Sequence, residues 1–247
     1  MSSVLIAAVA ALVGLLIGTV GVGGVLMVAF LALFGGLSIH QAAATSLFTF
    51  LFTGFLGSFL YHKRGSIDWS IAFPVCAGAL IFGYLGATAA AHIDPRPLSV
   101  IIALIIVAAG IYVLVPLKIS PQYRSGRGWR EQALLASVGA ASGFGSGFSG
   151  AGGPLFSVPL MVILRYVPLT AVATSQVLQI VAATSGSAGN LRHDFIDWPI
   201  AALVSVFELA GLILGVRFAH AASALQLRRL AGALCIASGA LLLARSL

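Results

Sequence analysis

Eight apolar runs, most of them near twenty residues long, occupy the greater part of this 247-residue sequence. They cover residues 4–20, 41–61, 70–92, 98–117, 132–147, 169–190, 198–221 and 230–244. A helix needs about 20 consecutive apolar residues to cross the hydrocarbon core of a bilayer. The runs therefore predict an all-α polytopic membrane protein, because only helices and closed barrels satisfy their backbone within lipid.

The charged residues are too few for a soluble protein of this length. Only 8% of the residues are charged and 60% are apolar, whereas ordinary soluble domains carry about 25% charged residues. This composition excludes a soluble enzyme. Cys76 and Cys235 lie far apart inside apolar runs, so neither a disulfide framework nor a metal cluster is indicated. The first run lacks a preceding basic stretch and makes a poor signal peptide.

Two shorter apolar stretches, 25–37 and 154–166, interrupt the series of long runs. At about 13 residues each they would form helices of about 20 Å, too short to span alone. Each follows a glycine cluster, Gly21-Val22-Gly23-Gly24 in one case and Gly150-Ala151-Gly152-Gly153 in the other. We expect the helix to break at both clusters and each short segment to be a broken or re-entrant helix.

An internal repeat relates the two halves of the chain at a constant offset of 129 residues. The offset superimposes the glycine clusters, the pair Thr45-Ser46 on Thr174-Ser175, and Ile67-Asp68-Trp69 on Ile196-Asp197-Trp198. We therefore expect one integral membrane domain made of repeat 1 (1–117), a cytoplasmic linker (118–130) and repeat 2 (131–247). Each repeat would hold about four long transmembrane helices and one short one.

The basic residues bear on whether the repeats are inverted or parallel. If each glycine break folds the chain back, the repeats are inverted. The Lys and Arg residues near the ends of the long runs then divide nine to three between the two sides of the membrane. If each break only kinks one span, the repeats are parallel and the division is eight to four. The positive-inside rule slightly favours inversion, and both arrangements place the 118–130 linker in the cytoplasm. Topogenic Lys and Arg thus explain the net charge of +7, and no nucleic-acid partner is expected.

The glycine clusters are the first candidates for a binding site. Gly23, Gly24, Gly152 and Gly153 precede the short helices, whose first-turn amides and positive dipole ends suit an anion. Alternatively, these glycines only permit a tight turn and close helix packing.

Uncharged donors form the second candidate group. Thr45, Ser46, Thr174 and Ser175 recur in both halves, and Gln176 and Gln179 follow in the second half. Hydroxyl and amide donors at membrane depth suit a small oxyanion. The alternative is hydrogen bonding between helices or back to the preceding turn.

Glu208 is the single acidic residue in the interior of a long run. An ionisable group at that depth is costly and is a functional hypothesis by default, so we expect it to couple transport to protons. The alternatives are a neutral acid hydrogen-bonded between helices, or a salt bridge to Arg217 or His220. Asp68 and Asp197 are interpreted as helix N-caps. No catalytic pair, metal-ligand spacing or nucleotide-binding fingerprint is present in the sequence, so neither an enzyme nor a cofactor is predicted.

The motifs resemble those of the TauE/SafE family of probable membrane transporters. The likeness rests on Gly-x-Gly-Gly, a following apolar stretch and an Ala-x-x-Thr-Ser helix, seen at Gly150–Gly153 with Ala171, Thr174 and Ser175. The first copy departs from the pattern, since Val25 and Phe30 stand where the second has Pro154 and Pro159. The resemblance implies secondary transport of small anions, chiefly sulfite and organosulfonates, in a bacterial inner membrane.

The expected function is therefore a secondary transporter of small sulfur oxyanions, alternating between two faces around a midplane site between the repeats. Its partners would be the anion, the lipid bilayer and protons as the coupling ion, and the sequence leaves oligomerisation open. The alternatives are a channel-like anion pore and a structural membrane subunit without transport activity.

Overall fold

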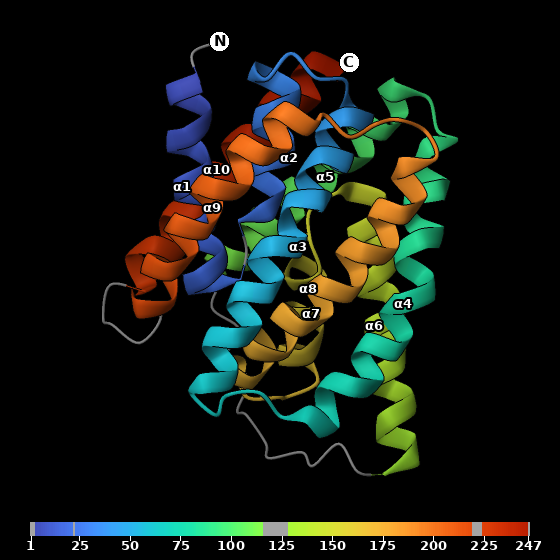
Figure 1. Cartoon of the computed structure of the whole chain (residues 1–247), viewed down its shortest axis with the longest axis vertical. Helices are drawn as coiled ribbons and strands as arrows, with labels where there is room; N and C mark the ends of the chain where they lie inside the picture. The colour runs from blue at the N-terminus through green and yellow to red at the C-terminus, as the bar shows by residue number, and fades with distance from the viewer. Residues whose placement is uncertain (1–2, 22, 116–127, 219–223, 247) are drawn as a thin grey trace.

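Ten helices make up the computed structural model of the described residues, which are 3–21, 23–115, 128–218 and 224–246 (Figure 1). In chain order they are α1 (Ser3–Val20), α2 (Gly24–Phe34), α3 (Ile39–Lys63), α4 (Trp69–Ala91), α5 (Pro95–Leu114), α6 (Trp129–Ser149), α7 (Pro154–Ile163), α8 (Pro168–Leu191), α9 (Trp198–Phe218) and α10 (Ala224–Ser246). Each apolar run of the sequence is a helix, so the predicted all-α class is confirmed.

The boundaries differ from the sequence expectation at several helix ends, among them the end of α2, which lies at Phe34 instead of 37. Helix α6 already begins at Trp129, so Arg130 belongs to its first turn rather than to the linker. Helix α7 ends at Ile163 instead of 166, because Arg165 adopts a positive φ of 69° that no helix accommodates. Residues 118–127 of the expected linker lie outside the described residues.

Five of the described helices are long and apolar enough to cross a membrane by themselves: α3, α4, α5, α9 and α10. Helices α6 and α8 have sufficient length but are richer in Gly, Ser and Thr. The hydroxyl and amide side chains of α8 are largely buried inside the protein. Neighbouring helices thus shield α8 from lipid, which explains how so polar a segment fits a membrane fold.

Both glycine clusters break the chain as predicted. Helix α1 ends before Gly21 and helix α6 ends before Gly150, and these two glycines have nearly equal positive φ values of 73° and 70°. Only glycine adopts this left-handed conformation at little cost. After each break a short helix, α2 or α7, starts inside the protein, and a long helix follows it.

Equivalent helices of the two halves run in opposite directions. In Figure 1, α3 descends from the top of the view, whereas α8, which starts 129 residues after α3, ascends from the bottom. Likewise α4 ascends and α9 descends. The directions favour inverted over parallel repeats, while the duplication itself stays a prediction from the sequence.

The two halves interlock through small residues. Helix α1 packs mainly on α9, and its counterpart α6 packs mainly on α4. At the first crossing Gly14 lies against the backbone of Glu208, and at the second Gly143 lies against Ala79. Glu208 follows Ala79 by 129 residues, as Gly143 follows Gly14. The absence of side chains at the two glycines lets the helix backbones meet, as is common between membrane helices.

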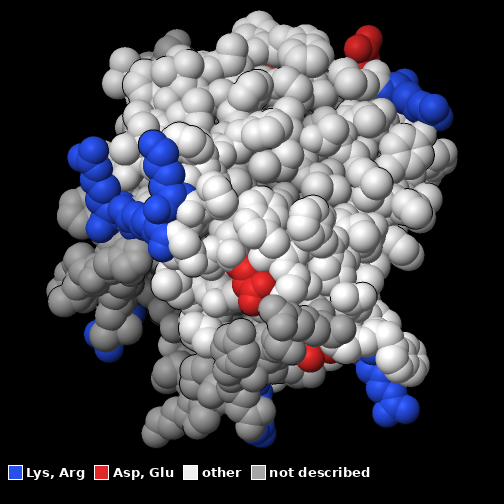
Figure 2. Space-filling view, turned by 60° about the horizontal axis from the view of Figure 1, so that its bottom comes forward, with Lys and Arg blue, Asp and Glu red and all other residues white. Residues whose placement is uncertain are grey.

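The outer surface is apolar between two charged ends. Large side chains such as Phe73, Ile81 and Val206 are more than 60% exposed on the flanks of α4 and α9, and the space-filling view shows a broad uncharged band beside the basic side chains (Figure 2). Trp69 and Trp198, at the starts of α4 and α9, lie at opposite ends of the protein and are exposed. This arrangement fits a lipid-facing belt with interfacial tryptophans.

Candidate functional site

The two helix breaks meet at the centre of the protein, with the ring of Phe50 between them. A Cβ added to Gly24, at the start of α2, would lie 2.7 Å from that ring and 2.5 Å from the carbonyl oxygen of Ala151. A Cβ on Gly152, before α7, would lie 3.1 Å from the same ring. Phe50 is fully buried in the middle of α3. The positive ends of α2 and α7 therefore converge on one central residue.

Gln179 of α8 also lies in this central region. Its side-chain amide donates a hydrogen bond to the Phe50 carbonyl oxygen at 3.0 Å and another to the Thr53 hydroxyl oxygen at 2.7 Å. Gly153 also lies close by, since a Cβ there would be 3.5 Å from the Gln179 Cα. We define the central cluster as Gly24, Phe50, Thr53, Gly152 and Gln179.

Glu208 lies beside this cluster, on the other side of α3, and is completely buried. Thr49 of α3 faces its carboxyl group, but the Thr49 hydroxyl donates to the Ser46 carbonyl oxygen at 2.9 Å. Neither carboxyl oxygen of Glu208 has a hydrogen-bond partner of normal geometry within the described part of the chain. The salt bridge to Arg217, one of the alternatives considered from the sequence, is not formed there, and His220 lies outside the described residues.

Several other buried polar atoms share this lack of a partner among the described residues. They are the hydroxyl oxygens of Ser46, Ser58, Ser142, Ser146, Thr174 and Ser187, and both amide atoms of Gln176. A buried polar group without a partner costs about 1–3 kcal/mol. Native structures keep such groups rarely, and each one requires an explanation such as a ligand or an ion. Here they supply hydroxyl and amide donors without a positive charge.

The predicted site residues do not all meet at one point. Gly23 packs against Val13 and Leu16 of α1 rather than facing the central cluster. The pair Thr45-Ser46 lies about 7 Å along α3 from Phe50, toward the top of Figure 1. The pair Thr174-Ser175 lies a similar distance along α8 on the opposite side. The hydroxyl pairs therefore lie above and below the central cluster.

Besides Gln179, two more of the predicted polar residues are already engaged. The Ser175 hydroxyl donates to the Val172 carbonyl oxygen at 2.7 Å, which is the back-bonding alternative considered from the sequence. The Thr45 hydroxyl oxygen accepts from the backbone N–H of Asp197 at 3.0 Å. Their neighbours Ser46 and Thr174 remain unpaired within the described residues.

Phe50, Ser142 and Ser146 were not expected among the central or unpaired residues. The spacing of Phe50 carried a signal, because Gln179 follows it by the 129 residues of the repeat offset. Ser142 and Ser146 are buried on α6 one turn apart, and nothing in their spacing distinguishes them from packing residues. Asp68 and Asp197 are helix N-caps, as predicted: their carboxylates accept from the N–H groups of Ser70 and Ile200 at 3.0 Å.

A bundle of apolar spans around two broken helices, with uncharged donors buried at its centre, is the architecture of a membrane transporter. The chain belongs to the TauE/SafE sulfite exporter family, whose model matches residues 6–242. This agrees with the resemblance found in the motifs, and it makes the chain a multi-pass membrane transporter with a small-molecule substrate rather than an enzyme.

Curated relatives carry similar descriptions. A probable membrane transporter protein of Xylella fastidiosa (strain 9a5c) is 26% identical over 234 residues, which cover 92% of this chain and 89% of the relative. The probable membrane transporter protein YunE of Bacillus subtilis is 25% identical over 75% of this chain and 78% of its own. A third, MJ0441 of Methanocaldococcus jannaschii, is 24% identical over 88% of this chain and 86% of its own. No solved structure matches significantly.

Proposed function

We propose that this chain is a proton-coupled secondary transporter of sulfite or organosulfonates in the bacterial inner membrane, working by alternating access. The observation that carries the proposal is the buried, uncharged donor set around the convergent starts of α2 and α7. A singly or doubly charged oxyanion that passes along α3 and α8 would complete, one after another, the hydrogen bonds that Ser46, Gln176 and Thr174 leave unmade.

Neutral donors suit such a substrate better than lysine or arginine would. An anion held by hydrogen bonds and helix dipoles is stabilised without a full opposite charge, so it can leave again on the other side. Buried basic side chains are absent from the described part of the central region. Binding by Gly24, Gly152 and Gly153 would use backbone groups only, and Gly23 would hold the break in place.

Glu208 provides the coupling in this proposal. Its carboxyl group lies at the middle of α9, one helix away from the central cluster, and has no basic partner in the described residues. A carboxyl group at that depth is stable when it holds a proton and costly when it is charged. Transfer of a proton through Glu208 would therefore accompany movement of the anion.

The test is transport in proteoliposomes with labelled sulfite, sulfoacetate, taurine and sulfate under an imposed proton gradient. We expect saturable, gradient-driven accumulation of at least one of the sulfur oxyanions and none in empty liposomes. The double variant Thr174→Val/Ser175→Ala should raise the apparent KM, whereas Thr184→Val, on the exposed face of the same helix, should not. Absence of saturable flux for all four compounds would refute the substrate class, and equilibration without accumulation would indicate a pore.

A further inference from the structure

The two ends of the protein differ at positions that the 129-residue offset makes equivalent. At the end where α9 starts, the backbone N–H of Asp197 donates to the Thr45 hydroxyl oxygen at 3.0 Å. The equivalent pair at the other end is Asp68 and Thr174. There the Thr174 hydroxyl is buried and has no partner among the described residues, while the Asp68 side chain bonds only locally, to Ser70.

The apolar contacts at the two ends of the protein differ in the same way. Ile196 is only 7% exposed and packs in a small cluster with Ala44 and Ala201, and the Trp198 ring meets the Phe48 ring edge-on at 5.1 Å. The equivalent Ile67 is half-buried. The equivalent tryptophan, Trp69, packs on His62 and Phe73 instead of on α8.

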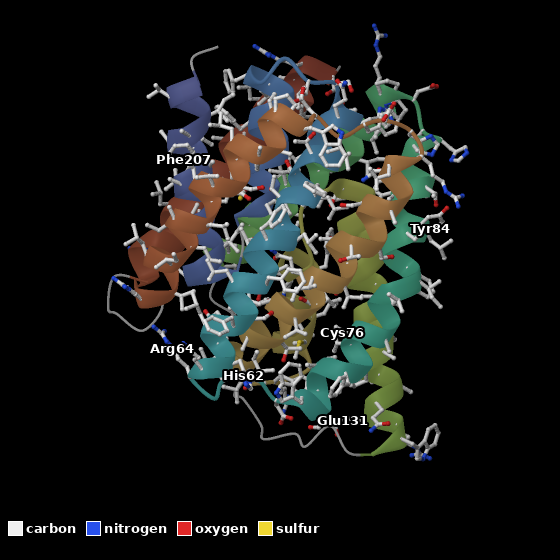
Figure 3. All side chains as sticks on the ribbon, viewed as in Figure 1. His62, Arg64, Cys76, Tyr84, Glu131 and Phe207 are labelled. Carbon is white, nitrogen blue, oxygen red and sulfur yellow. The ribbon has the colours of Figure 1, made fainter. Side chains whose placement is uncertain are left out.

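A pocket of about 670 Å³ opens at this end of the protein. It lies between the segment 64–69, which joins α3 to α4, and the start of α8 at 167–170. Arg64 lies at this lower end of the protein, together with His62 and Glu131 (Figure 3). Thr170 lines the pocket, and Thr174 follows it one turn further into the protein on the same face of α8.

We propose that this pocket is the cytoplasmic entrance to the transport site, and that Thr45 with Asp197 forms the closed gate at the opposite end. In the alternate state the hydrogen bond from the Asp197 N–H to Thr45 breaks, and the Asp68 N–H donates to Thr174 instead. The exchange conserves one gate hydrogen bond, so the two states can differ little in free energy, as alternating access requires. This inference rests on the proposed transport function and adds its gate and its entrance.

The proposal is testable without measuring transport, so its failure is distinguishable from failure of the transport function. The background is the full chain with Cys76→Ala and Cys235→Ala, in nanodiscs where both faces are accessible. The reporters are Ile67→Cys, at the pocket, and Ile196→Cys, under the closed gate. Reaction with a membrane-impermeant maleimide should be fast for Ile67→Cys and slow for Ile196→Cys.

The decisive variant is Thr45→Val, which removes the acceptor and preserves the side-chain shape. Loss of one hydrogen bond should shift the equilibrium about fivefold toward the alternate state. Reactivity should therefore rise for Ile196→Cys and fall for Ile67→Cys. The matched variant Thr174→Val removes a hydroxyl that has no partner among the described residues in this state, so it should leave Ile196→Cys protected and Ile67→Cys reactive.

Three results would overturn the proposal. One is unchanged reactivity of both reporters in Thr45→Val, since the hydrogen bond would then not hold a gate. Another is a rise for Ile196→Cys with no fall for Ile67→Cys, because that pattern reports local loosening instead of exchange between states. The third is that Thr174→Val has the same effect as Thr45→Val.

Discussion

The side-chain amide of Gln179 donates a hydrogen bond to the carbonyl oxygen of Phe50, a residue that precedes it by 129 positions. The two residues occupy equivalent places in the two halves, and they meet where α3 and α8 cross. The same amide also donates to Thr53. One side chain thus joins the halves at the level where both helix breaks converge.

Replacement of Gln179 by leucine should lower both stability and anion affinity. The variant loses two buried hydrogen bonds, which together contribute about 1–3 kcal/mol, so the Tm in detergent should fall by several degrees. Thermal unfolding and the KM for the transported anion measure the two effects. Thr184→Val removes a hydroxyl from the exposed face of α8 and serves as the control. A Gln179→Leu variant with wild-type Tm would show that the amide does not hold the halves together.

Gln176→Leu should have effects of opposite sign. Both amide atoms of Gln176 are buried without partners in the described residues, and the equivalent residue in the first half is Leu47. Leucine removes the buried polar atoms that lack hydrogen-bond partners, so Tm should rise. The affinity for the anion should fall about tenfold, because a hydrogen-bond donor is lost. The measurements are the same as for Gln179. A fall in Tm together with unchanged affinity would make Gln176 a structural residue.

The glycines at which two helices cross in close contact should tolerate no added side chain. A Cβ on Gly143 would lie 2.7 Å from the Cα of Ala79, where backbone rather than a movable side chain is in the way. Gly143→Ala should therefore destabilise the protein by about 1–3 kcal/mol. Gly128→Ala is the matched control, since nothing lies within 4 Å of its added Cβ. Equal thermal stability of the two variants would contradict the described packing of α6 on α4.

Hydropathy and glycine spacing predicted most of the fold because they reflect local constraints. Run length defined the helices, and Gly21 and Gly150 marked the breaks through a backbone conformation that other residues avoid. The end of α7 was misplaced because the expected stretch was extended through Arg165 to 166, whereas the chain turns at Arg165.

The candidate site was less accessible to sequence reasoning, since it depends on which helix faces meet. The hydroxyl pairs at Thr45 and Thr174 look alike in sequence, yet within the described residues only Thr45 has a partner across the helices. Phe50 is one of many buried apolar residues, and its place between the breaks follows from the crossing of α3 and α8. The repeat spacing shows which positions of the two halves are equivalent. It does not show whether the equivalent contacts are both formed in a given conformational state.

The inverted arrangement predicts which loops face the cytoplasm. Arg130 lies in the first turn of α6, at the end that carries Lys63 and Arg64, and Asp94 precedes α5 at the other end (Figure 1). In cells, an impermeant maleimide should label an Asp94→Cys variant directly and an Arg130→Cys variant only after permeabilisation. Both reporters are made in the Cys76→Ala/Cys235→Ala background. Labelling of both variants in intact cells would contradict the assigned topology.

The most direct test of the central claim compares wild type with Glu208→Gln in two transport modes. The modes are accumulation of labelled sulfite driven by a proton gradient, and exchange of labelled for unlabelled sulfite at equal pH. Glutamine keeps the size of the side chain and cannot release a proton, so the account predicts that Glu208→Gln loses gradient-driven accumulation but retains exchange. Accumulation at the wild-type level in Glu208→Gln would contradict proton coupling through this carboxyl group, and absence of both modes in the wild-type protein would contradict sulfite transport itself.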